Sequence, residues 1–362
     1  MDKKIETPFY QKICFNLISL AIISLALFYA SDILLPLLFS ILLASLLLPV
    51  TRFLARKRLN RSLSILIPLT VSIVIGVGIV YFLSSQVINF MDDVPTLKER
   101  ITEISDSFQQ WVRDNTRMTI RKQNQYFDDT VEDLKEKAPQ LVGQTFVSLT
   151  SVLVYAIFLL LYTFLILFHR SNIKAFLISL FKNGSEERVQ EVLTESTTIA
   201  QQYLTGLLIE TTLVFTLNTI GFLILGIKYP VFLALLAALL NLIPYVGIIV
   251  ANIICMLITL VSSENTSDVL WVGAILAVVQ FLDNNFGMPL IVGTKVRINA
   301  LVTILGVFIG GALCGVPGMF LAIPALAFLK VIFDKVPDLN PWGMILGDNH
   351  EEGQKLKPLK AK

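Results

Sequence analysis

Residues Pro230 to Val261 read PVFLALLAALLNLIPYVGIIVANIICMLITLV, a run of 32 residues without a charged side chain. A second run of the same length, Ile298–Leu329, reads INALVTILGVFIGGALCGVPGMFLAIPALAFL. About 20 apolar residues suffice to cross the hydrocarbon layer of a bilayer, whereas a helix of 32 residues would be about 48 Å long. Each run is therefore too long for one membrane-spanning helix, unless that helix is strongly tilted.

Helix-breaking residues lie near the middle of both runs. Asn241–Gly247 (NLIPYVG) interrupts the first run, and Gly310–Gly318 (GGALCGVPG) interrupts the second. Proline removes a backbone hydrogen bond and glycine loosens a helix, so we expect each run to fold as two half-helices that form a re-entrant hairpin. A single kinked span is the alternative. The residues expected at the two breaks are Pro244, Tyr245, Gly247, Gly315, Pro317 and Gly318.

The composition of the whole chain is that of a membrane protein. Of its 362 residues, 55% are hydrophobic and only 15% are charged, against about 25% charged in soluble domains. Mean hydropathy is +0.73. The net charge of +2 excludes the strongly basic surface of a nucleic-acid-binding protein. We expect an all-α polytopic transmembrane bundle of about eight membrane segments, with the lipid bilayer as its partner and no nucleic acid.

Other apolar segments predict the remaining spans. They are Ile13–Ala30, Ile33–Val50, Leu63–Leu83, Phe146–Phe168, Leu204–Ile227 and Val269–Val292. The short loop 52–61 carries five basic residues, which predicts that it lies in the cytoplasm together with both chain termini. A patch that binds anionic lipid is the alternative interpretation of those basic residues.

Two polar segments between the spans have helical periodicity. In Ser84–Thr145, apolar residues recur every three or four positions, which predicts an extracytoplasmic helical insert. This insert either packs beside the membrane or serves as a gate or partner dock. Asn172–Tyr203 predicts an interfacial helix on the cytoplasmic side that leads into the next span. The expected parts of the chain are residues 1–83 (spans 1–3), 84–145 (insert), 146–203 (span 4 and amphipathic helix), 204–333 (transport core) and 334–362 (cytoplasmic tail).

Two carboxylates lie within predicted spans. Glu210 is near the cytoplasmic start of one span and Asp283 near the cytoplasmic end of another, so both are expected at a similar depth. A carboxylate inside a span costs about 2–3 kcal/mol on insertion scales, so it usually faces a cavity, an ion or a partner. The pair therefore predicts a shared coupling cation or proton. Alternatively, both side chains reach the interface or accept hydrogen bonds from Thr211, Thr212, Asn284 or Asn285.

Amides extend the candidate substrate- or ion-binding site beyond the two acids. Its expected asparagines are Asn218, Asn241, Asn284 and Asn285. Such amides also hold helices together, which is the alternative for each. The order of a span with one acid and then a broken run occurs twice, which predicts an inverted repeat whose broken helices meet near the membrane midplane.

Several kinds of chemistry find no support in the residues. The three cysteines lie in apolar runs without a CxxC pair, and two histidines cannot build a His-based metal site, so no metal or cofactor is expected. The chain has no GxxxxGK[ST] motif for an ATPase of its own. No nucleophile, base and orienting group occur together, so an enzyme is not expected.

Three motifs of the C-terminal half resemble the autoinducer-2 exporter (AI-2E) family of bacterial membrane proteins. They are NLIPYVG at 241–247, DNNFGMPLIVGTKV at 283–296 and GVPGMFLAIP at 315–324. The resemblance covers nearly the whole length, although its N-terminal half is generic hydropathy. Two departures are Ile248, where the family often has proline, and Glu210, which is not a general family feature.

The resemblance implies a homo-oligomeric transporter of the bacterial inner membrane. Family members are associated with export of the furanone-type quorum-sensing signal autoinducer-2, and others with Na⁺(Li⁺)/H⁺ antiport. We therefore expect gradient-driven export of a small polar solute, coupled to Na⁺ or H⁺. Two alternatives stay open at this stage: a Na⁺(Li⁺)/H⁺ antiporter, and a non-transporting membrane scaffold or signalling protein that docks a partner on Ser84–Thr145.

Overall fold

The computed structural model describes residues 30–91, 154–180, 186–263, 267–287, 298–336 and 339–347, with Asn265 and scattered positions between 14 and 29. This part of the chain is helical and contains no β-strand, which confirms the all-α prediction. Six of its helices are long and apolar enough to cross a membrane. The elements are α2 (Ser31–Arg56), α3 (Arg61–Met91), an unlabelled helix (Val154–Ser179), α6 (Glu186–Ile224), α7 (Pro230–Leu240), α8 (Val246–Ser262), α9 (Ser267–Leu282), the π-helix η1 (Asp283–Gly287), α11 (Ala300–Lys335) and α12 (Asn340–Leu346).

Three predicted segments lie mostly or wholly outside the described residues. They are the first span Ile13–Ala30, the insert from residue 92 to 145, and the tail from residue 348 onward. The first eight residues of the predicted insert, 84–91, continue α3 as helix. The third span is therefore longer than its apolar core alone predicted.

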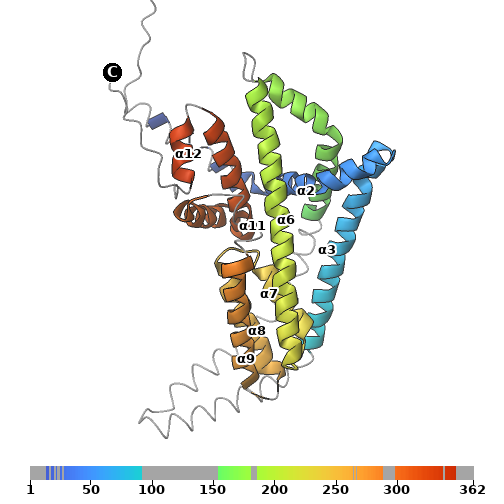
Figure 1. Cartoon of the computed structure of the whole chain (residues 1–362), viewed down its shortest axis with the longest axis vertical. Helices are drawn as coiled ribbons and strands as arrows, with labels where there is room; N and C mark the ends of the chain where they lie inside the picture. Colours follow the sequence, from blue (N-terminus) through green and yellow to red (C-terminus); the bar gives the residue numbers. More distant parts are fainter. Residues whose placement is uncertain are drawn as a thin grey trace, which may run out of the picture.

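The long helix α6 is the central element of the fold. Its 39 residues correspond to about 58 Å, nearly twice the ~30 Å hydrocarbon layer. Helices α2, α7, α9 and α11 all pack against it, and Figure 1 shows it running through the molecule. We expected an interfacial helix ending at Tyr203 and then a separate span. Instead α6 is continuous through Tyr203, because no proline interrupts the sequence between its two ends.

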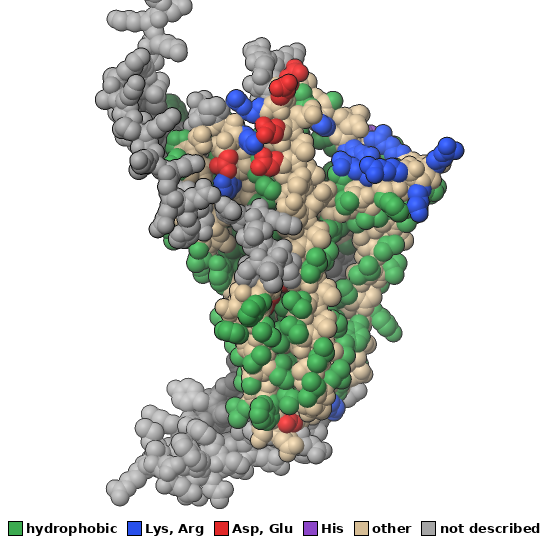
Figure 2. Space-filling view, in the orientation of Figure 1, with side chains coloured by type: hydrophobic (Ala, Val, Ile, Leu, Met, Phe, Trp, Pro, Cys, Tyr) green, Lys and Arg blue, Asp and Glu red, His purple; other side chains and the backbone are tan. Residues whose placement is uncertain are grey.

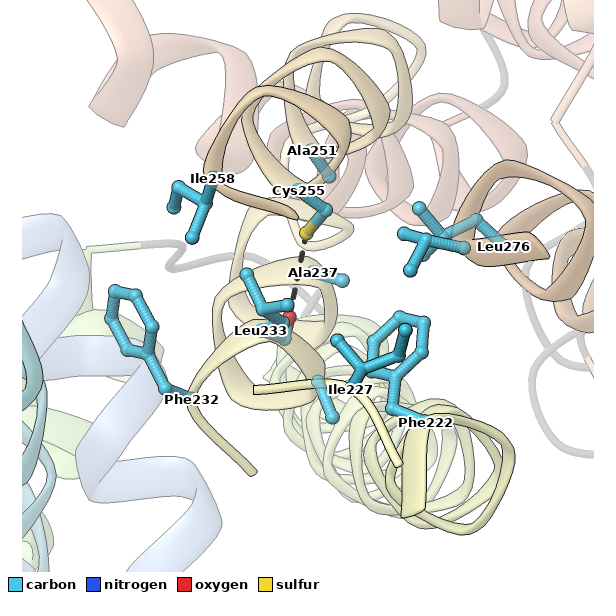
Figure 3. Close-up of a cluster of buried hydrophobic side chains, with 11 residues drawn as sticks. Phe222, Ile227, Phe232, Leu233, Ala237, Ala251, Cys255, Ile258 and Leu276 are labelled. Carbon is cyan, nitrogen blue, oxygen red and sulfur yellow. Dashed lines mark hydrogen bonds between the residues drawn. The ribbon is translucent and has the colours of Figure 1, made fainter. Parts of the chain in front are cut away.

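The first overlong run folds as two helices joined by a break. Helix α7 ends at Leu240, α8 begins at Val246, and the two helices pack against each other as a hairpin. Their contact is a hydrophobic core shared with α6 and α9, shown in Figure 3. Within this core Cys255 Sγ of α8 lies 3.6 Å from the carbonyl oxygen of Leu233 on α7. The predicted interruption of this run is confirmed.

The second overlong run also turns back on itself. Cys314 and Gly315 have non-helical backbone angles inside α11, and Gly315 adopts φ +63° and ψ −150°, a region that essentially only glycine occupies. A Cβ added to Gly318 would lie 2.0 Å from the carbonyl oxygen of Gly310, so the chain passes itself at van der Waals distance. Residues eight apart would be about 12 Å apart along one straight helix. The two halves of α11 therefore form a second hairpin, with its closest approach at glycines.

Charged side chains gather at one end of the bundle. The α2–α3 turn, the start of α6 and the end of α11 carry them, and Figure 2 shows these groups above an apolar flank. At this end Lys335 of α11 pairs with Glu191 and Glu195 of α6, at 2.6 and 3.2 Å. The predicted grouping of these connections on one side of the membrane agrees with this arrangement.

Candidate functional site

The two carboxylates of the spans meet in the interior. Glu210 is on α6 and is 7% exposed, and Asp283 is the first residue of η1 and is 3% exposed. Each carboxyl group interacts electrostatically with the other, within the range of a side-chain hydrogen bond. Helix α6 packs against both α9 and η1, which brings together two residues 73 positions apart.

A π-helical turn presents Asp283 to α6. Helix α9 is regular up to Leu282, and the backbone then widens to the π form over Asp283–Gly287. Single π turns of this kind are rare and recur at functional sites. Gly287 closes the turn against the carboxyl group, because a Cβ at this position would lie 2.6 Å from Asp283 Oδ1. No periodicity in the sequence DNNFG predicts this change of helix type.

Asn241 connects the carboxyl pair to the first break. It is the residue that follows α7, and its side chain interacts with the Asp283 carboxyl group. The end of α7 also packs close to α6, since Ala238 shares a small core with Val214 and Val279. The break between α7 and α8 therefore lies beside Glu210 and Asp283.

The backbone of this break is strained. Tyr245 has φ +64° and ψ −51°, and the amide of Val246 donates to the carbonyl of Pro244 at 2.7 Å. These features define the rare, strained form of the γ-turn. Holding a bulky residue at positive φ costs about 1–3 kcal/mol, and such strain persists where surrounding contacts impose it. Gly247 is one such contact, because a Cβ there would lie 1.7 Å from the Leu240 carbonyl oxygen.

Three buried oxygen atoms in this region have no hydrogen-bond donor. They are Oε2 of Glu210, Oδ1 of Asp283 and Oδ1 of Asn218. Asn218 is 1% exposed and lies two turns along α6 from Glu210, on the same face. Acceptors buried without a donor are costly, and a proton or cation between two carboxylates would relieve their repulsion.

The other predicted site residues lie elsewhere. Asn284 and Asn285 are exposed; Asn284 Oδ1 accepts from Gln280, and the Asn285 amide donates to the Phe281 carbonyl. The hydroxyl of Thr212 likewise donates to its own helix, at the Leu208 carbonyl. These three groups are therefore engaged away from the carboxyl pair, which removes them as its hydrogen-bond donors.

The second break does not join this group of residues. Gly315 and Pro317 are exposed, and no hydrogen bond within the described ranges links them to Glu210 or Asp283. The hairpin of α11 instead reaches α6 through Leu321, which packs with Tyr203 and Leu204. The described residues also contain no cluster of three or more His, Cys, Asp or Glu side chains that would hold a metal ion.

The chain is similar to membrane transport proteins along nearly its full length. Residues 17–338 match the family described as "AI-2E family transporter". A candidate transport protein of Bacillus subtilis, YrrI, is 27% identical over 83% of this chain and 85% of its own length. The candidate transport protein YhhT of Escherichia coli K12 is 22% identical over 94% of this chain and 97% of its own length.

Proposed function

Because the chain belongs to the AI-2E transporter family and is a multi-pass membrane protein, we propose that it is a secondary transporter. It exports a small polar solute such as autoinducer-2, using the gradient of a coupling cation or proton. The coupling ion binds between Glu210 and Asp283. We further propose that the protein resides in the bacterial inner membrane, with the end that carries the α2–α3 turn in the cytoplasm.

One observation supports this proposal most strongly: two buried carboxyl groups, from α6 and η1, interact beside a broken helix. Apolar packing alone does not require acids at this place. Oxygen atoms that lack donors are suited to H⁺, Na⁺ or Li⁺, which are hard cations that oxygen ligands coordinate. Broken helices are also the usual site of ion and substrate binding in secondary transporters.

Coupling follows from the position of Asn241. When an ion or proton neutralises the carboxyl pair, Asp283 interacts less strongly with the Asn241 amide, and the end of α7 is released from η1. Because the α7–α8 break is strained at Tyr245, a small change at Asn241 shifts the balance between two arrangements of the hairpin. Helix α6 is the frame against which the hairpin moves.

Export from proteoliposomes tests this function. Vesicles loaded with autoinducer-2 are given an imposed pH or Na⁺ gradient, and efflux is measured. We expect the gradient to accelerate efflux through the wild-type protein. Glu210→Gln should slow it at least about tenfold, because a charge-assisted contact is worth about 1.5–3 kcal/mol. Glu187→Gln, the same change at an exposed position of α6, should leave efflux unchanged. Efflux that ignores every gradient would refute the proposal.

A Na⁺(Li⁺)/H⁺ antiporter is the second candidate, and the same carboxyl pair favours it. In that case the two acids are the whole binding site and no organic solute is carried. Adding Na⁺ or Li⁺ to vesicles that hold a pH indicator would then move protons without any solute present. If the proton movement requires autoinducer-2, the solute exporter is favoured instead. The scaffold alternative rests on the insert, most of which lies outside the described residues.

A further inference from the structure

Three arginines from three different helices converge at the charged end of the bundle. Arg52 lies in the last two turns of α2, Arg61 is the first residue of α3, and Arg170 belongs to the helix Val154–Ser179. The guanidinium of Arg170 lies within electrostatic range of both other arginines. In Figure 2 this basic cluster stands out over the α2–α3 turn.

The cluster is held in place by contacts of its own. Arg61 Nη2 donates a hydrogen bond to the Phe168 carbonyl, and its guanidinium lies 4.9 Å from the centre of the Phe168 ring. These contacts tie the start of α3 to the helix that carries Arg170. The positive-inside rule accounts for a basic α2–α3 turn, but it does not require a third arginine from another helix to join it.

The positive charge of this cluster is uncompensated. None of the three arginines pairs with a carboxylate within the described part of the chain, where the ion pairs involve Lys330 and Lys335. Arg170 is half-buried, and its Nη1 is buried without an acceptor. Like charges held together with an unsatisfied donor create a site for an anion, and guanidinium groups match phosphate oxygens in geometry.

An apolar surface adjoins the arginines on the side of the spans. It consists of exposed side chains of α2, α3 and the helix Val154–Ser179, namely Phe53, Leu63, Leu66, Ile67 and Leu165. In a membrane protein such a surface faces acyl chains. A phosphate that is attached to acyl chains therefore matches both parts of this region, whereas a free phosphate matches only the arginines.

We propose that Arg52, Arg61 and Arg170 form a binding site for the phosphate of an anionic phospholipid, whose acyl chains lie along the adjoining apolar surface. The site is separate from the carboxyl pair and does not depend on the transport proposal. Each arginine contributes to lipid affinity by about fivefold, the usual effect of one basic side chain at an anionic membrane surface.

Lipid titration of the full-length protein tests this site. The purified protein in detergent is titrated with dioleoylphosphatidylglycerol, dioleoylphosphatidylcholine or inorganic phosphate, and bound lipid is counted by native mass spectrometry. We expect the anionic lipid to bind with a defined occupancy that Arg52→Gln and Arg170→Gln each reduce about fivefold. Arg188→Gln removes one charge from an exposed position of α6 and should leave the occupancy unchanged.

Three outcomes would overturn the proposal. Equal binding of the zwitterionic lipid would show that no anion site exists. Loss of occupancy in all three variants alike would indicate diffuse surface charge. Competition by millimolar inorganic phosphate, with equal affinity for phosphate and lipid, would identify a free-anion site. Melting curves without added lipid establish that each variant is folded, and Arg170→Lys tests whether the guanidinium or only its charge is needed.

Discussion

At the scale of single residues, the interior of α6 combines two kinds of polar group. Glu210 interacts with a second acid, whereas Asn218 on the same face has an amide oxygen without a donor. A residue that merely held two helices together would satisfy that oxygen. An unsatisfied acceptor costs about 1–3 kcal/mol, so its presence points to a role that is realised only when something binds.

Replacing Asn218 should separate stability from transport. In Asn218→Leu the unsatisfied amide is lost and a similar volume stays filled, so the melting temperature should be unchanged or higher. Autoinducer-2 efflux should fall. Thermal unfolding in detergent and vesicle efflux measure the two effects. Thr219→Val, next to it on α6, removes a hydroxyl bonded to the Phe215 carbonyl and should change neither. A destabilised Asn218→Leu with normal efflux would mean that the amide is structural.

At the scale of elements, two hairpins are built with different devices. The first uses a strained tyrosine between Pro244 and Val246, with Gly247 close against the end of α7. The second uses Gly315 at positive φ and a contact between Gly310 and Gly318. Both have the close backbone approach that only glycine permits. Their different neighbours suggest different tasks, since the first break lies beside the acids and the second does not.

The first break should not tolerate a side chain at position 247. In Gly247→Ala the new Cβ would overlap the Leu240 carbonyl, so the turn must open at a cost of about 3 kcal/mol. We expect a lower melting temperature and loss of efflux. Gly76→Ala is the matched control, because a Cβ there meets nothing within 4 Å and a helical alanine is favoured by about 1 kcal/mol. Equal stability of the two variants would argue against the hairpin geometry.

The break should also be open to water rather than to lipid. Tyr245→Cys should react with a membrane-impermeant maleimide, because the break borders the proposed ion path. Val74→Cys, an exposed position in the middle of α3, should stay unreactive since it faces acyl chains. The experiment requires a background in which Cys14, Cys255 and Cys314 are replaced. Full protection of Tyr245→Cys in every condition would contradict a path through this break.

At the scale of the whole molecule, charge is distributed along one axis. The α2–α3 turn, the start of α6 and the end of α11 are at one end, and exposed apolar side chains cover the flank of α3. A soluble protein would expose few such residues, and here they are the lipid-facing surface. Assembly into a homo-oligomer stays a prediction of the family resemblance.

Sidedness follows from this axis. Lys57→Cys and Arg188→Cys, both at the charged end, should be labelled by impermeant maleimide only after the cells are permeabilised. Ser267→Cys, at the start of α9, should be labelled in intact cells. The same cysteine-free background serves here. Labelling of Lys57→Cys and Arg188→Cys from opposite sides would disprove the shared end, and labelling of both from outside would reverse the proposed orientation.

Much of this architecture could be predicted from the sequence. Breakers in overlong apolar runs predict both interruptions, and the positions of Glu210 and Asp283 relative to basic loops predict a shared depth. The sequence analysis did not anticipate the continuity of α6, because a fall in hydropathy near Tyr203 does not interrupt hydrogen bonding. It also missed the π turn at Asp283 and the γ-turn at Tyr245, whose geometry tertiary contacts such as those of Gly247 and Gly287 impose.

The account depends most on Glu210 and Asp283 acting as one site, and a double-mutant cycle of gradient-driven efflux measures this directly. If one ion is held by both carboxyl groups, Glu210→Gln, Asp283→Asn and the double variant should all lose gradient-driven efflux to the same residual rate, since removing either group already abolishes the site. If the two losses simply add, or if either single variant keeps the wild-type response to the gradient, the two acids do not share a coupling ion.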